Sequence, residues 1–187
     1  MINGSLTDHF LIAMPSLVDS NFARSVIHIC QHDEEGAMGL VINRLAAFDL
    51  GHVLRELDLP VPGAPIEHTP ILVGGPVHSE RGFVLHENDS RQWESSLAIN
   101  DELSVTTSRD ILMAFSAGEP PSRHLFALGY AGWTAGQLEQ ELADNAWLTV
   151  PADRNVLFNV PIEQRWQAAA GLLGIDPARL SGYAGRA

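Results

Sequence analysis

The sequence predicts an α+β protein with a single domain over residues 1–187. Short apolar runs follow one another at hairpin spacing, only a few segments have helical periodicity, and no repeat of 20 to 50 residues is visible. A chain of 187 residues is long enough to bury about 70% of its unfolded surface in one fold. The hairpin spacing favours an α+β arrangement over a doubly wound parallel sheet.

The first half of the chain is predicted to hold short strands and one helix. The strands are expected at residues 10–14, 25–32, 38–43, 71–73 and 83–86. The polar turn Asp33–Gly36 joins the second and third of these into a hairpin. A helix is expected over Leu50–Leu59, because its leucines and Val53 recur on one side. The four prolines of Pro60–Pro70 predict a loop or an extended connector.

The second half continues the same alternation. Strands are expected at residues 97–99, 103–107 and 123–128, and helices at residues 110–117 and 162–173. Gly129 and Gly132 predict a turn after the strand at 123–128. Thr134 and Gln137 fit a capping box, in which the two side chains satisfy the free N–H groups at the start of a helix.

The glycine-rich corner at residues 129–137 has two interpretations. Free N–H groups at the start of a helix favour negative charge, so the corner is a candidate site for a small anionic or polar ligand. In the structural interpretation, the glycines allow a tight turn, Trp133 packs, and the capping pair closes the helix end. The corner lacks the glycine pattern and the lysine of nucleotide-phosphate loops.

Composition excludes several classes of protein. The net charge is -12, and all eleven basic residues are arginines that never occur in pairs, so direct nucleic-acid binding is not expected. The single cysteine, Cys30, excludes an intramolecular disulfide and a multi-cysteine zinc motif. No secretory signal is visible, and the apolar run Phe10–Pro15 is too short to span a bilayer. A cytoplasmic protein without membrane association is expected.

Four ordered blocks of the sequence resemble the AlgH/YqgE family of bacterial proteins. The blocks are Phe10–Pro15; Phe22 with Arg24–Ile27, His32 and Gly36–Asn43; Gly74–Val77 with Arg81–His86; and Gly129–Trp133 with Gly136–Glu139, Glu141–Leu142, Asn145 and Trp147. The resemblance runs from about residue 6 to residue 166. Two positions depart from the usual family pattern: Gln31 stands where glutamate is common, and His28 stands where an aromatic residue is usual.

The resemblance implies a fold more clearly than a reaction. It implies a bent, mostly antiparallel sheet that forms a pseudo-barrel with flanking helices. It also implies a regulatory role, since the family is linked to alginate production and its members are described as transcriptional regulators. The resemblance transfers no catalytic residue. The acidic chain has no helix-turn-helix signature, so we expect any effect on transcription to be indirect.

Histidines supply the remaining candidates for chemistry. On a regular strand, His28, Cys30 and His32 would share one face and could bind zinc or copper. The alternative is that these histidines hold no metal and that Cys30 is a small core residue, and we expect neither a metal nor a cofactor. His86 ends an apolar strand next to Glu87 and could transfer protons, or it could simply bond to backbone.

Two functions from different classes follow. The first is a non-enzymatic regulatory or accessory protein that binds a protein partner or a small anionic ligand. The second is an uncharacterised enzyme with a pocket near Asn43, Gly74–Pro76, His86 and the Gly129–Gln137 corner, although the common hydrolase signatures are absent. The candidate ligand-binding residues are Asn43, Gly74, Gly75, Pro76, His86, Gly132, Trp133 and Gln137.

Overall fold

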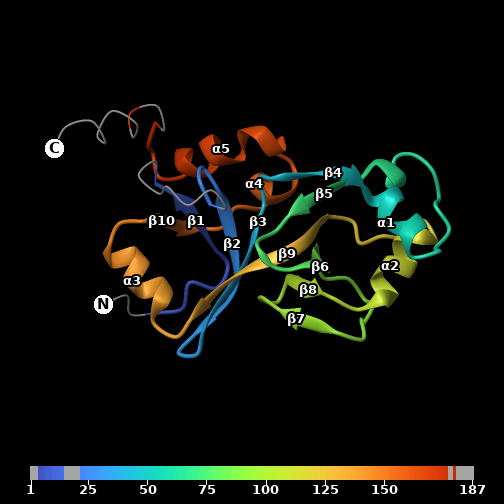
Figure 1. Cartoon of the computed structure of the whole chain (residues 1–187), viewed down its shortest axis with the longest axis horizontal. Helices are drawn as coiled ribbons and strands as arrows, with labels where there is room; N and C mark the ends of the chain where they lie inside the picture. Colours follow the sequence, from blue (N-terminus) through green and yellow to red (C-terminus); the bar gives the residue numbers. More distant parts are fainter. Residues whose placement is uncertain (1–3, 15–21, 177–178, 180–187) are drawn as a thin grey trace.

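The computed structural model describes residues 4–14, 22–176 and 179 (Figure 1). The strands are β1 (His9–Ala13), β2 (Val26–Asp33), β3 (Gly36–Val41), β4 (Leu45–Asp49), β5 (Pro70–Val73), β6 (Val77–Glu87), β7 (Ser96–Ala98), β8 (Leu103–Thr106), β9 (His124–Thr134) and β10 (Trp147–Pro151). The helices are α1 (Leu50–Glu56), α2 (Arg109–Ser116), α3 (Gln137–Ala143), α4 (Arg154–Phe158) and α5 (Arg165–Gly171), with 3₁₀ turns η1 (Ile66–His68) and η2 (Ile162–Gln164).

The strands form one curled, mostly antiparallel sheet, which confirms the predicted fold class. Its order is β10-β1-β2-β3-β9-β6-β8-β7, and β4 joins through β5. Every pair is antiparallel except β5 with β9. The sheet bends into a half-barrel, with α1 and α2 at one end, α3 at the other and α4 and α5 along one side (Figure 1).

Hydrophobic side chains of the described residues gather in three clusters. The first lies inside the curl and includes Phe10, Leu40 and Leu85, with α4 and α5 packed against it. The second joins α3 to the opposite face of β1, β2 and β3. The third packs α1 and α2 on β5, β6 and β9. The second and third clusters therefore lie at opposite ends of the molecule, with α3 at one end and α1 and α2 at the other.

Strand β9 is paired on both edges along the same residues. Phe126 and Leu128 bound a stretch that pairs with β5 and also with β6. Because a strand has only two edges, β5 and β6 lie on opposite sides of β9, and the chain between them must cross over it. This crossing consists of Gly74–Pro76.

The crossing brings two stretches of backbone into direct contact. A Cβ on Gly75 would lie 2.1 Å from the carbonyl carbon of Tyr130, and a Cβ on Gly74 would lie 2.4 Å from the Gly129 oxygen. Gly129 has φ of 75° and faces Gly75 in return. Only residues without a side chain can approach this closely.

The predicted turn at Gly129 and Gly132 is wrong. Strand β9 runs through both glycines to Thr134. A glycine pair beside a strand usually marks a turn, but here Gly129 is needed because another backbone crosses it.

The predicted capping box at the start of α3 is only half formed. The Thr134 N–H donates to Oε1 of Gln137 at 3.0 Å. The residue before the helix is Gly136, in the left-handed conformation, and no side chain caps the helix there. The Thr134 hydroxyl bonds to the Gln137 side chain at 3.4 Å, so it leaves the helix N–H groups uncapped.

Three elements were not predicted from the sequence: β4, β10 and α4. Strand β4 is mostly exposed and lies at the sheet margin, so it carries no buried apolar run. Helix α4 has five residues, which is too few to show helical periodicity.

No helix in the described part of the chain is long and apolar enough to cross a membrane.

We expect Gly75→Ala to lower the free energy of unfolding by about 3 kcal/mol or more, because the added methyl group would overlap the backbone of Tyr130. The matched control is Gly171→Ala, since a Cβ on this helical glycine meets nothing within 4 Å. The control should be neutral or stabilising by up to about 1 kcal/mol. Urea denaturation of both variants measures the difference, and equal stabilities would contradict the crossing.

Candidate functional site

Asn43 and the Gly74–Pro76 segment make hydrogen bonds that hold the strands of the sheet together. The Asn43 side chain accepts a hydrogen bond from the Val26 N–H at 3.0 Å and donates to the Arg24 carbonyl at 2.9 Å. It thereby fastens the start of β2 to the end of β3. The Gly74 carbonyl accepts from the Val41 N–H at 2.8 Å, so the crossing also bridges β3 and β9.

His86 is buried, with 2% of its surface exposed. Its Nδ1 lies 3.0 Å from the Glu87 carbonyl, which can only accept, so Nδ1 carries the proton. Nε2 then accepts from the Thr106 hydroxyl at 2.7 Å, and the Ser96 hydroxyl lies 3.0 Å from Thr106. Burial lowers the pKa of His86, against smaller raising effects of Glu87 and Asp89.

The eight predicted site residues do not share one pocket. Asn43 is used at the base of β2, and Gln137 bonds to the Thr134 backbone. His86 lines a concavity of about 360 Å³ together with Asp89, Arg91 and Trp93. Gly132 and Trp133 line a different and larger one.

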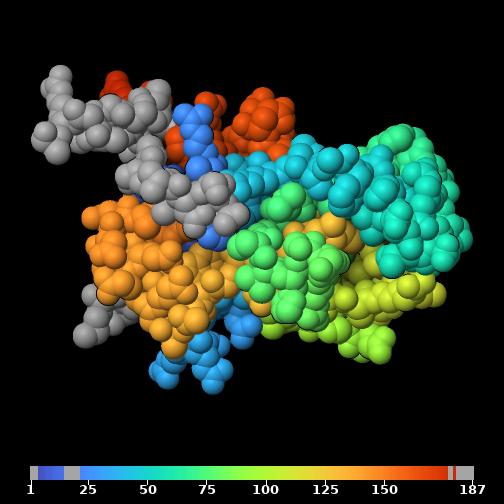
Figure 2. All heavy atoms as spheres, in the orientation of Figure 1, coloured from blue at the N-terminus to red at the C-terminus, as the bar shows by residue number. Residues whose placement is uncertain are grey.

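The larger concavity, which we name the β9 groove, has a volume of about 580 Å³. Its lining comes from the tip of the β2–β3 hairpin, the start of β6 and the end of β9. The lining residues are Gln31, Asp33, Glu35, Gly36, Ala37, Met38, Val77, Arg81, Phe83, Tyr130, Gly132, Trp133 and Thr134. In Figure 2 the hairpin tip projects at the lower edge of the molecule, beside the orange surface of β9 and α3.

The floor of the β9 groove is aromatic and its rim is charged. Phe83 and Tyr130 meet edge to face, with ring centroids 5.5 Å apart. The Arg81 guanidinium carbon lies 5.7 Å from the centre of the Phe83 ring. Asp33 and Glu35 stand on the hairpin side of the groove. The groove therefore offers an aromatic surface between a cation and two carboxylates.

The end of β9 also presents backbone to the groove. Residues 131–134 pair with β3 on one edge, whereas the described pairing with β6 stops at Tyr130. The Trp133 carbonyl faces β3, since a Cβ on Gly36 would lie 2.2 Å from its oxygen. Because successive residues of a strand point to opposite edges, the N–H and C=O of Gly132 point away from β3.

Gly132 is not explained by the fold. It has no positive φ, and a Cβ at this position would meet only the edge of the Tyr130 ring, at 3.3 Å. This distinguishes it from Gly75 and Gly129, which are held against backbone. The missing side chain at Gly132 keeps the floor of the β9 groove open.

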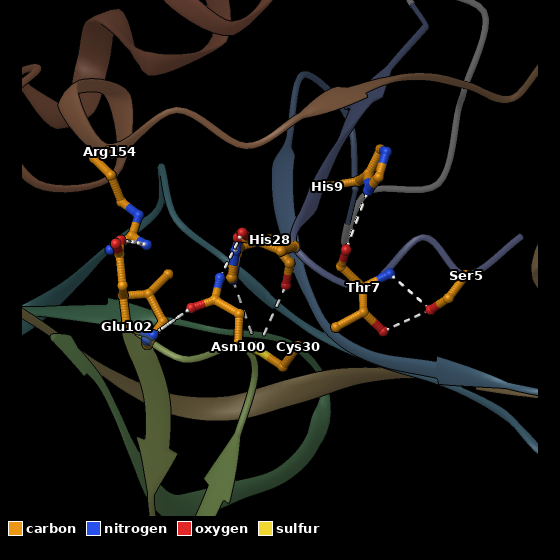
Figure 3. Close-up of polar contacts among 10 residues, drawn as sticks. Ser5, Thr7, His9, His28, Cys30, Asn100, Glu102 and Arg154 are labelled. Carbon is orange, nitrogen blue, oxygen red and sulfur yellow. Dashed lines mark hydrogen bonds and ion pairs between the residues drawn. The ribbon is translucent and has the colours of Figure 1, made fainter. Parts of the chain in front are cut away.

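A second polar network centres on His28 of β2 and includes Asn100 (Figure 3). His28 is fully buried, and its Nε2 donates to the Asp8 carboxylate at 2.8 Å. Asn100 donates to the other Asp8 oxygen at 2.8 Å. Burial alone would raise the pKa of Asp8, but the hydrogen bond and charge of His28, with smaller effects of Arg154 and Asn100, lower it.

Cys30 extends this network without becoming reactive. Its sulfur lies 3.8 Å from Nδ1 of His28, so Asp8, His28 and Cys30 connect in the order of a thiol-enzyme triad. The thiol is 1% exposed, and burial, followed by the charge of Asp8, strongly raises its pKa. A protonated thiol in the core is a poor nucleophile, which agrees with the structural interpretation of Cys30.

His32 does not share a face with His28 and Cys30. The register of β2 against β3 shifts between Ile29 and Gln31, and this bulge turns His32 away. His32 accepts from the Leu6 N–H and lies 2.5 Å from Glu139 of α3. No group of three His, Cys, Asp or Glu side chains suited to a metal ion occurs among the described residues.

Comparison with known proteins decides the family. The AlgH-like family model matches residues 10–178 of this chain. The chain belongs to the AlgH-like family. It is 54% identical over 181 residues to a UPF0301 protein of Stenotrophomonas maltophilia, covering 97% of this chain and 96% of that protein. It is 52% identical over 182 residues to a UPF0301 protein of Xanthomonas euvesicatoria, with the same two coverages.

Solved structures show the same fold. The solution structure of the AlgH protein from Pseudomonas aeruginosa is similar over 100% of both chains, with a TM-score of 0.80 and 48% identity. The crystal structure of a protein from Corynebacterium diphtheriae gives a TM-score of 0.67 at 22% identity, covering 89% of this chain and 86% of that one, and is evidence for the fold alone.

Sequence reasoning missed the residues that form most of the β9 groove. Met38, Arg81 and Phe83 occur in two separate blocks, and only the curled sheet brings these blocks together. The spacing of Arg81 and Phe83 was a usable signal, because residues two apart on a strand share a face.

We expect His86 to make the protein less stable in mild acid. Its lowered pKa means that the unfolded histidine binds a proton first as the pH falls. The folded state is therefore fully favoured above about pH 6.5 and loses stability as the pH falls from there towards the lowered pKa. His86→Gln should reduce this loss between pH 7 and pH 5, as measured by urea denaturation.

His52→Gln is the control, since His52 is exposed on α1. His124, whose pKa is also lowered by burial, keeps part of the pH dependence in both variants. An unchanged slope in His86→Gln would show that the buried imidazole does not titrate as described.

Proposed function

We propose that this AlgH-like protein is a non-enzymatic accessory protein that binds an extended segment of a protein partner in the β9 groove. The observation that carries the proposal is the combination at Gly132 of an open aromatic floor and backbone groups that point away from β3. An extended peptide can add to such an edge as a further strand. Its side chains would then alternate between the groove and solvent.

Charge suggests which partner segment fits. Arg81 on one side favours an acidic residue, while Asp33 and Glu35 on the other favour a basic one. The floor of Phe83 and Tyr130 favours an aromatic or apolar side chain between them. We therefore expect a segment with an aromatic centre and opposite charges at its ends.

We further propose that the protein acts in the cytoplasm and that any effect on transcription is indirect. The net charge of -12 and the absence of lysine disfavour a phosphate-binding surface. A regulatory effect would then arise through the bound partner.

We expect Gly132→Leu to weaken binding of a matching peptide at least tenfold, because the new side chain would fill the floor of the groove. The probe is a synthetic octapeptide with a central aromatic residue, a lysine towards one end and a glutamate towards the other, measured by fluorescence anisotropy. Gly171→Leu is the matched control, since a Cβ there meets nothing within 4 Å. Arg81→Ala should weaken binding severalfold and reduce its dependence on salt.

Peptide N-methylation tests the strand-addition mode. Methyl groups on amides that face β9 should abolish binding, and methyl groups on the alternate amides should not. Mass spectrometry of the recovered peptide should find it unchanged. Equal effects of both methylation patterns would contradict strand addition, and a cleaved or modified peptide would contradict the non-enzymatic role.

An uncharacterised enzyme remains the second candidate, and one observation favours it. Neutral His86 accepts a hydrogen bond from Thr106, which lies 3.0 Å from the hydroxyl of Ser96 on the wall of the smaller concavity. Such a chain could draw a proton from Ser96.

If this second candidate holds, a fluorophosphonate probe should label Ser96 in the native protein, and His86→Gln should reduce the labelling rate by at least tenfold. The exposed Ser79 on β6 is the internal control for non-specific labelling. Labelling that is equal at Ser96 and Ser79, or insensitive to His86, would remove the support for an enzyme.

A further inference from the structure

A third concavity lies on the α4–α5 side of the molecule. It has a volume of about 330 Å³ and is closed by η1 and β5, the start of β9, and the α4–η2–α5 segment. Its apolar walls include Leu72, Phe126, Phe158 and Ile162. The guanidinium-bearing side chain of Arg165, at the start of α5, also lines it. This is a cavity of small-molecule size with one cation in its wall.

Arg165 is the notable group because it is buried and forms no ion pair within the described part of the chain. It is 4% exposed, and no carboxylate lies within 4.0 Å of it among the described residues. Nε donates to the Val160 carbonyl at 3.0 Å and Nη1 donates to the Ile42 carbonyl at 2.6 Å. Nη2 makes no hydrogen bond to any residue that the structure describes.

Burying a cation without an anion is costly, since neutral carbonyls replace only part of its hydration. Burial lowers the pKa of Arg165 to about 10, against a smaller raising effect of Glu163. Glu163 itself is exposed on η2, outside ion-pair distance. The guanidinium therefore remains charged at neutral pH and has no ionic partner among the residues that the structure describes.

The other polar groups of the cavity limit the charge that it can accept. His68 at the mouth is held between Asp49 at 3.2 Å and Glu67 at 3.3 Å, so two carboxylates already stand there. His124 donates from Nδ1 to the Pro121 carbonyl at 2.8 Å, and burial lowers its pKa, so Nε2 is an acceptor at neutral pH. With Arg165 as its buried cation and two carboxylates beside His68, the cavity suits a ligand that carries a single negative charge.

We propose that this cavity is a binding site for a small organic monocarboxylate with an apolar body. The carboxylate would accept a charge-assisted hydrogen bond from the free Nη2 of Arg165. The apolar body would lie against Leu72, Phe126 and Phe158. A phosphate would bring more charge than Arg165 alone can balance and would leave the apolar walls unused.

Isothermal titration calorimetry of the full chain with acetate, butyrate, hexanoate and benzoate tests the proposal. Affinity should rise by about fourfold for each added methylene until the cavity is full, because each buries apolar surface. Hexanoate or benzoate should bind with a dissociation constant below about 1 mM. Inorganic phosphate is the comparison anion and should bind more weakly than either.

Two variants locate the site. Arg165→Met keeps the length of the side chain and removes its charge, so benzoate affinity should fall at least thirtyfold. Because this change also removes the bonds to Ile42 and Val160, a second variant, Ile162→Trp, fills the cavity and leaves Arg165 in place. It should lower benzoate affinity at least tenfold. Arg109→Met is the control, since Arg109 bonds to the Leu57 carbonyl on the surface.

Each remaining outcome counts against the proposal. Benzoate binding that survives both variants would place the carboxylate elsewhere. No binding of any carboxylate by the wild-type chain would make Arg165 a purely structural cation. Tighter binding of phosphate than of hexanoate would replace a carboxylate site by a phosphate site.

Discussion

The close contact between the crossing segment and β9 is the constraint on which the rest of the structure depends. Gly74 and Gly75 pass directly over Gly129 and the peptide between Tyr130 and Ala131, so β5 and β6 can occupy opposite edges of one strand. The crossing also bonds to β3 through Val41. The crossing segment therefore determines the residue at which β9 stops pairing with β6. Beyond that residue one edge of β9 is unpaired among the described residues, and this edge lines the β9 groove.

Several hydrogen bonds of buried histidines hold this arrangement together. Asp8, His28 and Asn100 tie β1 and β2 to the turn before β8, and His32 ties β2 to α3 through Glu139. Hydrogen bonds of this kind satisfy buried polar groups and stabilise the fold. Two features are not accounted for in this way: the open glycine in the β9 groove, and the buried arginine at the start of α5, which has no ion pair among the described residues. These two features carry the functional proposals.

The fold class and most core strands could be predicted from the sequence, because alternating apolar residues and turn signals are local. The contacts between distant segments could not. Glycines at residues 129–132 resemble a turn, and only the crossing explains why they lie within a strand. Met38 and Phe83 meet in the β9 groove although 45 positions separate them in the printed numbering. Arg165 is an ordinary helix residue in sequence, and its burial depends on the end of β3.

The position of β1 and β9 inside the sheet has a consequence for how the chain matures on the ribosome. Strand β1 pairs with β10 and β3 pairs with β9, so the N-terminal meander keeps both of its outer edges bare until the last third of the chain has emerged. Synthesis at about 5 to 20 residues per second leaves these edges uncovered for several seconds. The two edges can therefore be covered only late in synthesis, once β9 and β10 have emerged.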